Sequence, residues 1–369
     1  MKHYKLVSLL LFGMMHPIVS FAMTHTDGDG HVWYFELNGN GDATITICPG
    51  IDNLVVPREI EGHKVVAFSA SLSWAQAVVG GGLRHYSARS VFFPSSVTNI
   101  NTFGFRGAVD LMAIEVEAGN SRYETVDGVF YEKDYHTSEY ERLRYPNERR
   151  LVYCVNGKKE LTIAADVTAI GNESRGGYNG KYGAGYSLPY QCEWGGLDLV
   201  EINVDPANPC YHSIDGMLCQ GEWLCQCPMA YEGDKSIPPT IKELAYFAFW
   251  NCSKLNNIDV AEDHSEFAAY DGALYSKDYA ELLAAPGGRT HIKVHSQTKK
   301  IGSLSQSQNL ETIELPEGLE EIGTSWMSFA FEGCEKLAKV AIPQTVCAVG
   351  EQSFMNCYGL RSVDWGANR

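Results

Sequence analysis

The chain has 369 residues, 45% of them hydrophobic and 20% charged, and its formal net charge at pH 7 is −16. This acidic balance argues against a nucleic-acid-binding protein, because affinity for the phosphate backbone depends on an excess of lysine and arginine. The length would permit two or three domains, unless a repeat runs through the whole chain as one array.

Residues 1–22 have the pattern of a secretory signal peptide. Two lysines precede an apolar stretch from Leu6 to Phe12, and small residues lead up to a cleavage site after Ala22. No later segment holds the roughly twenty consecutive apolar residues that a membrane-spanning helix needs. No cysteine follows the cleavage site directly, which argues against a lipoprotein. We therefore expect an exported protein, secreted or at the cell surface, with mature residues 23–369.

Residues 23–53 differ from the rest of the chain and predict a strand, a turn and a strand. The strands are expected near 31–37 and 43–47, and we interpret the segment as a cap that covers the open end of a solenoid. Oxygen-rich runs at 27–29 and 38–42 resemble calcium loops. Neither continues to the acidic residue that ends a twelve-residue loop, so both are interpreted as turns.

From residue 54 onward, a phrase of about two dozen residues recurs. It reads apolar-Pro, two further apolar positions, Phe-x-x-Cys and then Leu-x-x-apolar-x-apolar, and its last residue begins the next copy. Copies begin at Val56, Phe93, Ile163, Ile237, Val294, Leu315 and Ile342. Units of this length cannot bury their apolar face alone, so the phrase predicts one solenoid over residues 54–369.

The end of each phrase alternates apolar and polar residues with period two, which predicts a short strand with an inward apolar face. The Phe and Cys of the return arm are expected to point into the same core. The cysteines in this position are Cys252, Cys334 and Cys357. We expect reduced, buried thiols there that bond to loop carbonyls.

Longer inserts interrupt the simple copies. Three of them contain Asp-Gly before an apolar run, at residues 127–128, 215–216 and 271–272, and this pair is typical of a hairpin turn. The hairpins are expected to widen a coil, and a ligand role for the three aspartates is the minority interpretation. Inserts are expected near residues 72–88, 120–150, 172–196, 208–234 and 264–291.

At these residues the chain resembles the BspA-type leucine-rich repeat family of secreted and surface proteins from bacteria and some parasitic protists. The resemblance spans roughly residues 54 to 365. It implies an α/β-type but strand-dominated right-handed solenoid, with a parallel sheet on one face and short helical or irregular return segments on the other. It also implies adhesion or macromolecular recognition rather than catalysis, and it supplies no catalytic, cofactor-binding or metal-binding residues.

Eleven cysteines in an exported chain raise the question of disulfides. One insert holds the candidate disulfide cluster Cys210, Cys219, Cys225 and Cys227. Cys219 would face Cys225 or Cys227 across two strands, and the sequence leaves both the bonded and the reduced state open. The spacing lacks the paired Cys-x-x-Cys of closed zinc sites, so no metal is predicted.

No pattern in the chain predicts an enzyme. The sequence has no Gly-x-Ser-x-Gly and no His-Glu-x-x-His. The best candidate for a nucleophile is Cys192, with His212 near in sequence, but nothing indicates an oxyanion hole or an oriented base. We therefore expect neither catalytic residues nor a cofactor.

One candidate binding surface is a loop rich in aromatic residues and glycine. Its aromatic residues follow at intervals of four: Tyr178, Tyr182, Tyr186, Tyr190 and Trp194. Tyrosine and tryptophan offer large contact areas at low entropic cost, which makes the loop a hypothesis for partner or glycan recognition. The alternative is an aromatic lid packed on the solenoid's own flank.

The other candidate is the outward row of the predicted sheet. The middle residues of its strands are Phe92, Glu115, Thr162, Asn203, Ser236, Asp259, Lys293, Glu314, Ala341 and Asp364. The acidic members are Glu115, Asp259, Glu314 and Asp364, and neighbours in such a row lie about 4.7 Å apart. They would suit a basic partner, whose affinity should then fall with added salt. The alternative is a solvated polar face.

The sequence therefore predicts a secreted or surface-associated, non-catalytic leucine-rich repeat protein that recognises an extracellular protein or polysaccharide. One alternative is a structural envelope or assembly component without an external ligand. A hydrolase is the third interpretation, because the chain shows no convergent acid, base or nucleophile.

Overall fold

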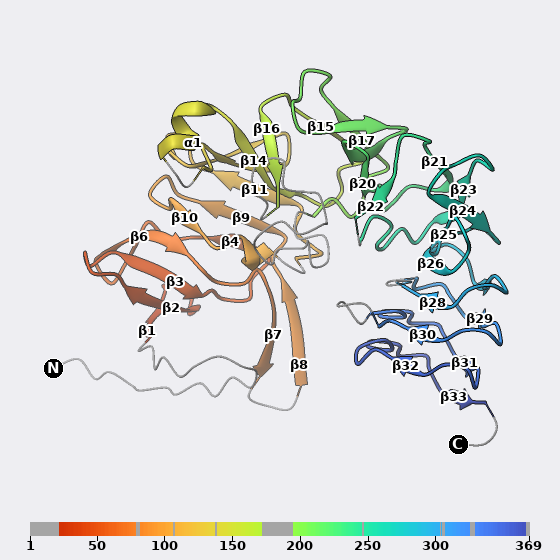
Figure 1. Ribbon diagram of the computed structural model, residues 1–369. Helices are drawn as coiled ribbons and strands as arrows, with labels where there is room; N and C mark the ends of the chain where they lie inside the picture. The colour runs from red at the N-terminus through yellow and green to blue at the C-terminus, as the bar shows by residue number, and fades with distance from the viewer. Residues whose placement is uncertain are drawn as a thin grey trace. The chain divides into compact units, whose positions relative to one another are not determined.

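The computed structural model describes residues 22–78, 82–105, 108–136, 139–171, 195–245, 247–302, 304, 307–324 and 329–366. The chain divides into two compact units, residues 1–133 and 134–369. Both consist almost entirely of short strands joined by turns (Figure 1). In the described ranges there is one α-helix, α1 (Glu139–Arg144), and one 3-10 helix, η1 (Thr102–Phe105). No helix there is long and apolar enough to cross a membrane.

The first unit holds the strands β1 to β13. They are β1 (Met23–Thr26), β2 (Val32–Leu37), β3 (Ala43–Ile47), β4 (Asn53–Val55), β5 (Glu59–Ile60), β6 (His63–Phe68), β7 (Ser73–Val78), β8 (Gly82–Ser87), β9 (Ser90–Phe93), β10 (Asn99–Ile100), β11 (Ala113–Val116), β12 (Tyr123–Val126) and β13 (Val129–Lys133). Strands β1, β2 and β3 pair antiparallel, and β3 then pairs parallel with β6, which pairs parallel with β10. A second parallel ladder has the order β11-β9-β4.

The N-terminal segment forms the expected hairpin, with β2 paired to β3. The Asn38 side-chain oxygen accepts hydrogen bonds from the backbone N–H groups of Asn40 (2.9 Å) and Asp42 (3.0 Å). These bonds close the turn between the strands, as asparagine does in turns of this kind. Because β3 also pairs with β6, the hairpin leads directly into the first ladder. Further along, β7 and β8 form an antiparallel hairpin where an insert was expected near residues 72–88.

Large aromatic side chains fill the interior of the first unit. Phe68, Phe93, Phe105 and Phe130 are each at most 1% exposed. The rings of Phe93 and Phe130 stack at 6.0 Å, and those of Phe68 and Phe93 meet edge to face at 5.3 Å. Phe105 occupies the Phe position of the repeated phrase and Phe93 begins the same copy, so the spacing of the phrase brings both rings to a common core.

The second unit holds β14 to β33. They are β14 (Arg149–Cys154), β15 (Glu160–Ile163), β16 (Val167–Ile170), β17 (Glu201–Val204), β18 (His212–Ile214), β19 (Met217–Gln220), β20 (Trp223–Gln226), β21 (Gly233–Ile237), β22 (Glu243–Leu244), β23 (Leu255–Val260), β24 (Phe267–Tyr270), β25 (Ala273–Ser276), β26 (Glu281–Ala284), β27 (His291–Lys293), β28 (Lys300–Ile301), β29 (Thr312–Glu314), β30 (Glu321–Ile322), β31 (Lys339–Ile342), β32 (Ala348–Val349) and β33 (Ser362–Trp365).

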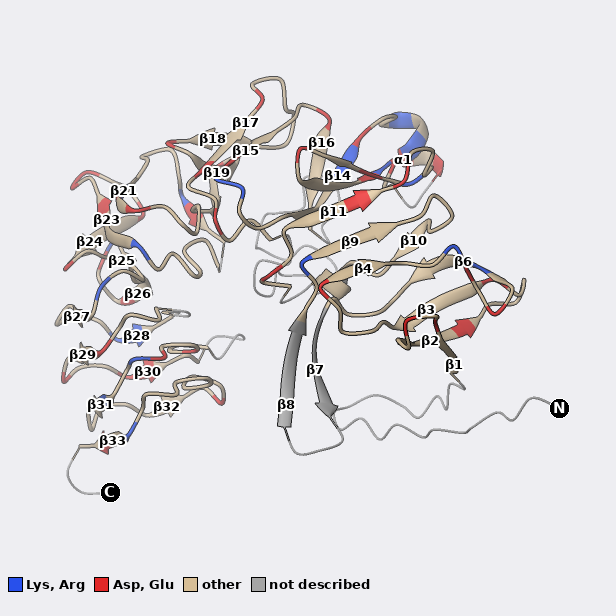
Figure 2. Cartoon of the chain, turned by 180° about the vertical axis from the view of Figure 1, so that it is seen from behind, with Lys and Arg blue, Asp and Glu red and all other residues tan. Residues whose placement is uncertain are grey.

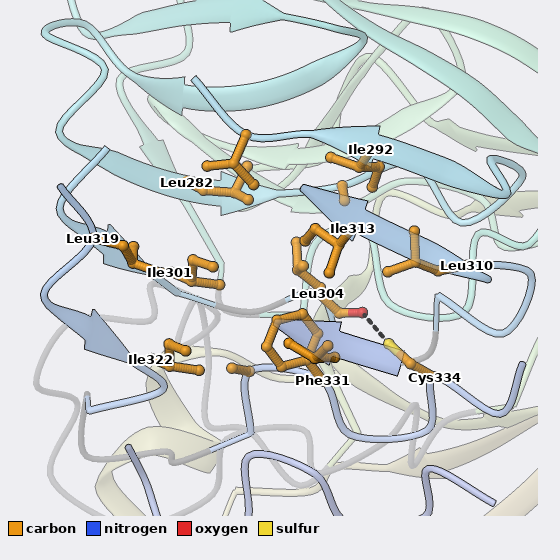
Figure 3. Close-up of a cluster of buried hydrophobic side chains, with 14 of the residues drawn as sticks. Leu282, Ile292, Ile301, Leu304, Leu310, Ile313, Leu319, Ile322, Phe331 and Cys334 are labelled. Atoms are coloured by element: carbon orange, nitrogen blue, oxygen red, sulfur yellow. Dashed lines mark hydrogen bonds between the residues drawn. The ribbon is translucent and has the colours of Figure 1, made fainter. Parts of the chain in front are cut away.

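Two ladders run along the C-terminal coils. The first has the order β27-β29-β31-β33, and the second continues from β26 through β28 and β30 to β32. In Figure 1 they form two separate blue columns, with each coil contributing one strand to each column. Apolar side chains from both ladders meet between them, and Figure 3 shows Ile301 and Ile322 from one ladder opposite Ile292 and Ile313 from the other. Each coil thus buries its apolar residues only by stacking on its neighbours.

The Asp-Gly inserts form sheets of three strands rather than the two expected. In the second insert β18, β19 and β20 pair antiparallel in sequence, and in the third β24, β25 and β26 do the same. Asp215 and Gly216 have φ values of 50° and 70°, and Asp271 and Gly272 of 49° and 71°. Two successive positive φ values define the hairpin turn that Asp-Gly favours. The extra strand arises because the residues before the turn also pair.

These turns divide the row of parallel strands into separate ladders. The Gly216 carbonyl accepts the backbone N–H of Ile202 in β17 (2.9 Å), and the Gly272 carbonyl accepts that of Ile258 in β23 (2.8 Å). Each turn therefore bonds to the strand edge at which the next strand of a continuous sheet would pair. In the second unit the row accordingly consists of β15-β17, β21-β23 and β27-β29-β31-β33.

The strand-dominated solenoid is confirmed, whereas the helical share of the expected α/β architecture is not. The described return arms are turns, for example at Cys334, whose N–H donates to the Phe331 carbonyl (3.1 Å), and at Leu337, whose N–H donates to the Cys334 carbonyl (3.1 Å). Helix formation requires a nucleus of several residues before it becomes favourable. The bonds at Cys334 and Leu337 each span three residues, as in single turns, and do not continue into a helix.

Candidate recognition surface

The outward residues of the strand row lie in register on neighbouring strands. The pairs are Phe92 with Glu115, Thr162 with Asn203, Ser236 with Asp259, Lys293 with Glu314, and Ala341 with Asp364. These five pairs agree with the order of the row, but the row is not continuous as expected: the strands of Glu115 and Thr162, of Asn203 and Ser236, and of Asp259 and Lys293 lie in separate ladders. The acidic members are all exposed. Glu115 belongs to the first unit and the other three acids belong to the second.

Basic side chains offset two of these acids. Glu314 lies 3.5 Å from His291 Nε2, and Asp364 lies 2.6 Å from Lys339 Nζ. Figure 2 shows basic and acidic residues interspersed over the coils that carry β27 to β33. The face therefore has mixed charge. Ion pairs exposed to this degree contribute little to stability, so these side chains remain adaptable for a partner.

A groove opens where the row is interrupted by the Asp215-Gly216 turn. Its volume is about 1080 Å³, including space open to solvent. It is lined by Lys159, Val200, Glu201, Asp215, Gly216, Ala230, Tyr231, Glu232, Lys235 and Lys254. These residues come from β17, β21, the insert turn and the loops that lead into the neighbouring strands. No pattern in the sequence predicted this groove.

Lys235, at the groove, breaks the apolar pattern of the repeat. Its partner across the β21-β23 ladder is Ile258, a fully buried residue. The equivalent inward positions of other strands in the second unit hold Leu161, Ile202, Ile292, Ile313 and Val340, all buried. A lysine in this position was readable from the sequence, because it replaces the apolar residue in Leu-x-x-apolar-x-apolar. Such breaks of a local rule concentrate at functional or strained sites.

The Lys235 ammonium group is buried but has hydrogen-bond and cation–π partners. Its side chain is only 3% exposed, and Nζ donates to the Asp215 backbone carbonyl (2.5 Å) and to the Asp215 carboxylate (3.0 Å). Nζ also lies 3.9 Å from the centroid of the Tyr231 ring, within the range of a cation–π contact. The Tyr231 hydroxyl donates to the Asp234 carbonyl (3.1 Å). These contacts hold the lysine and the aromatic ring in fixed positions beside the groove.

The aromatic loop of the sequence analysis cannot be placed. Tyr178, Tyr182, Tyr186, Tyr190 and Trp194 lie outside the described residues, as does Cys192. The loop therefore stays a prediction.

The three cysteines in the Phe-x-x-Cys position are reduced thiols, as expected, and each bonds to a carbonyl of the preceding coil. Sγ of Cys252 donates to the Cys227 carbonyl (3.7 Å), and Sγ of Cys334 donates to the Leu304 carbonyl (3.6 Å; Figure 3). Sγ of Cys357 donates to the Phe331 carbonyl (3.0 Å). Burial raises the pKa of the Cys334 thiol and brings the pKa of Cys357 to about 11.

The four cysteines of the candidate disulfide cluster are reduced in the structure. A bulge between Leu218 and Cys219 shifts the register of β19 and β20, so that Leu224 stands opposite Cys219. Cys225 is the extra residue of this bulge, between Leu224 and Gln226, and the pairing of these cysteines stays a prediction. Burial raises the pKa of Cys219 to about 12, which disfavours the reactive thiolate.

Alkylation should distinguish the exposed thiol of Cys347 from the buried thiols of Cys252 and Cys334. Because Cys347 is exposed and Cys252 and Cys334 are at most 1% exposed, iodoacetamide at neutral to mildly alkaline pH should label Cys347 first. Cys252 and Cys334 should react only after unfolding. Mass spectrometry of peptides from native and denatured samples measures this order. Fast labelling of Cys334 in the native protein would contradict the buried ladder of thiols.

Asp27, Asp29 and His31 form a cluster in which one ligand atom from each lies within 4.8 Å of the others. The Asp27 carboxylate already accepts hydrogen bonds from the backbone of Asp29 (3.0 Å) and His31 (2.9 Å) and from Trp33 Nε1 (3.0 Å). The Trp33 bond is the main cause that lowers the pKa of Asp27 to about 2. These bonds account for the cluster as a closed turn, in agreement with its interpretation from the sequence.

The fold and this surface define a class of protein: a solenoid of stacked strand-bearing coils with an exposed, mixed-charge row. A family model for the BspA type leucine-rich repeat region matches in six copies, over residues 234–276 and 288–368. Over these residues the chain has the repeats that define the BspA-type leucine-rich repeat region. No curated protein matches the chain significantly.

Similar solved structures are bacterial. The pneumococcal vaccine antigen PcpA has 17% identity, with 92% of this chain and 80% of that chain covered and a TM-score of 0.33. A leucine-rich repeat protein from Eubacterium ventriosum has 14% identity, with 93% and 72% covered and a TM-score of 0.33. A leucine rich cell surface protein from Faecalibacterium prausnitzii has 16% identity, with 94% and 96% covered and a TM-score of 0.29. At such TM-scores, these likenesses carry no argument about function.

Proposed function

We propose that the chain is a secreted or surface-associated, non-catalytic protein that recognises an extracellular protein or polysaccharide through the outward row of its second unit. Membership of a leucine-rich repeat family supports the proposal, because stacked repeats present extended surfaces that these proteins use for binding. Because one fold can host many functions, the proposal depends on the residues of the surface rather than on the fold.

The observation that carries the proposal is the alternation of buried and exposed residues along the strands of the row. In β29, Ile313 is buried at 8% exposure between the exposed Thr312 and Glu314. In β31, Val340 is fully buried between the exposed Lys339 and Ala341. The inward residues hold the coils together, so the outward ones can serve a partner without loss of core packing. A rigid backbone beneath them lowers the entropic cost of binding.

The first experiment is a screen of residues 23–369 against extracellular-matrix proteins and glycans. A variant that carries Ser236→Arg and Ala341→Arg places two bulky side chains on exposed outward positions of the row. We expect it to weaken any saturable binding at least about tenfold, since truncation or obstruction at the centre of an interface has effects of this size. Surface plasmon resonance measures the change.

The matched control carries Gln297→Arg and Gln352→Arg, which add the same charge at exposed positions in turns outside the row. The control should bind like the unmodified chain. Equal binding by the row variant would contradict the proposal. A folded, monomeric sample that binds nothing in the screen would favour the alternative, a structural component without an external ligand.

A further inference from the structure

The groove beside Lys235 exists because a turn bonds to β17 in place of a further strand. Asp215 and Gly216 bond to β17 through the Gly216 carbonyl, yet they supply only a two-residue turn where a neighbouring coil supplies a strand of four or five residues. A recess results on the outward side. It is lined from both flanks, by Glu201 of β17 and by Lys235 of β21.

The other described turn of this kind in the second unit is filled differently and serves as an internal comparison. There the Arg289 guanidinium donates to the Asp271 carboxylate (2.9 Å) and to the Asn257 side-chain oxygen (3.2 Å). A Cβ added at Gly272 would lie 2.4 Å from the Asn257 side chain and 2.7 Å from the Arg289 side chain. At Gly216 an added Cβ would meet only Glu201, at 3.1 Å. The recess at Asp271 is thus packed with side chains, whereas the one at Asp215 is open.

The charges that line the open groove balance one another. Its basic residues are Lys159, Lys235 and Lys254, and its acidic residues are Glu201, Asp215 and Glu232. Lys254 lies 3.9 Å from Glu232, and Lys235 lies 3.0 Å from Asp215. A strongly charged ligand would meet repulsion as well as attraction here. An uncharged ligand with many hydroxyl groups meets no such penalty, because hydroxyls donate to carboxylates and accept from ammonium groups.

Tyr231 adds an aromatic surface to these polar groups. One face of its ring holds the Lys235 ammonium group at 3.9 Å, and its hydroxyl is fixed on the Asp234 carbonyl. The ring is half-buried and lines the groove, so part of it is accessible to a ligand. Tyrosine binds well to molecules that are apolar on one side and polar on the other. A pyranose ring, with C–H groups on one face and hydroxyls at its edge, has this character.

We infer that this groove is a binding site for an uncharged saccharide segment of a polysaccharide. The inference rests on the proposed recognition function and names the ligand class of one site within it. The cavity itself has a volume of about 600 Å³, which lies within the range of known small-molecule pockets and suits an oligosaccharide better than an ion. Lys235, held by Asp215, packs against Tyr231 and fixes the position of its ring at the groove.

The test uses residues 23–369 and linear hexasaccharides of glucose, mannose and galactose, with sulfated and sialylated oligosaccharides and charged peptides as counter-probes. At least one neutral hexasaccharide should bind saturably in isothermal titration calorimetry. Its affinity should change less than about twofold between low and high salt, because an uncharged ligand is not subject to ionic screening. Tyr231→Ala should weaken this binding at least about tenfold.

Tyr358→Ala is the matched control, because Tyr358 is 79% exposed and lies in the last described coil, away from the groove residues. It should bind like the unmodified chain. If Tyr231→Ala fails to fold, Glu201→Gln tests the same site by removing one acceptor of hydroxyl groups and should weaken binding about fivefold.

Two results would overturn the inference: no neutral hexasaccharide binds, or one binds equally well to the Tyr231→Ala and Glu201→Gln variants. The broader proposal fails separately. If no neutral hexasaccharide binds but a protein ligand binds and is lost with Ser236→Arg and Ala341→Arg, the saccharide site is refuted and recognition by the row stands.

Discussion

Phe331→Ala is expected to lower the free energy of unfolding of the C-terminal coils by about 3–5 kcal/mol, the usual loss for a large aromatic residue in a packed core. Phe331 is fully buried, and its ring stacks on that of Phe354 at 5.1 Å with an angle of 12° between the planes. Its backbone carbonyl also accepts the Cys357 thiol of the next coil. The cavity would therefore loosen two adjacent coils at once.

In a solenoid each coil contacts only its neighbours, so the damage should remain local. Native-state hydrogen exchange should show faster exchange in β30 to β33, with little change in β14 to β16. Tyr358→Ala, at a residue 79% exposed, is the control and should alter stability by no more than about 0.5 kcal/mol. Uniform loss of protection throughout the second unit would contradict the picture of stacked coils, each stabilised by the next.

The periodic parts of the fold could be predicted because the inward and outward positions of a strand follow directly from a period of two. Ile313 and Val340 are buried and their neighbours are exposed, as the phrase requires. The thiols of Cys334 and Cys357 also bond to carbonyls as expected, because a buried thiol behaves as a small apolar group with a weak S–H donor. Each copy of the phrase shows again which residues point into the core and which point outward.

The features that were missed depend on contacts between residues distant in the chain. The bond from Ile258 N–H to the Gly272 carbonyl divides the row into separate ladders, yet neither residue indicates that pairing by its type. The third strand of each insert and the shift that places Leu224 opposite Cys219 likewise follow from tertiary pairing. Propensity and pattern specify which residues form strands much better than which strands become neighbours.

The groove is an intermediate case. Its position follows from a turn that the Asp-Gly signal predicts, and Lys235 visibly interrupts an apolar pattern. What the sequence does not reveal is that the neighbouring recess is filled by Arg289 while this one stays open. For the acidic row, the register within each ladder could be predicted. The contacts of Glu314 with His291 and of Asp364 with Lys339 could not, because they depend on side-chain positions.

Two single variants at the paired residues Lys235 and Ile258 test whether the buried lysine is kept for function or for stability. Ile258→Lys should destabilise the second unit by about 3 kcal/mol or more, because it buries an ammonium group without a partner. Ile258 is fully buried, and both oxygens of the nearby Asp271 carboxylate are already occupied, by Arg289 (2.9 Å) and by the Lys293 N–H (2.7 Å). The new charge would have no carboxylate to meet.

Lys235→Ile restores the apolar residue of the repeat and should leave stability unchanged or raise it by about 1–2 kcal/mol, as removal of a buried ion pair often does. Asp215, with its side chain 68% exposed, would remain solvated. Urea unfolding of both variants measures the stabilities, and titration with a neutral hexasaccharide measures binding. Retained stability with lost binding would mean that Lys235 is kept for a ligand. A marked loss of stability in Lys235→Ile would instead make the lysine the clamp that holds the insert turn on the solenoid, because the ion pair with Asp215 would then outweigh the desolvation of its charge.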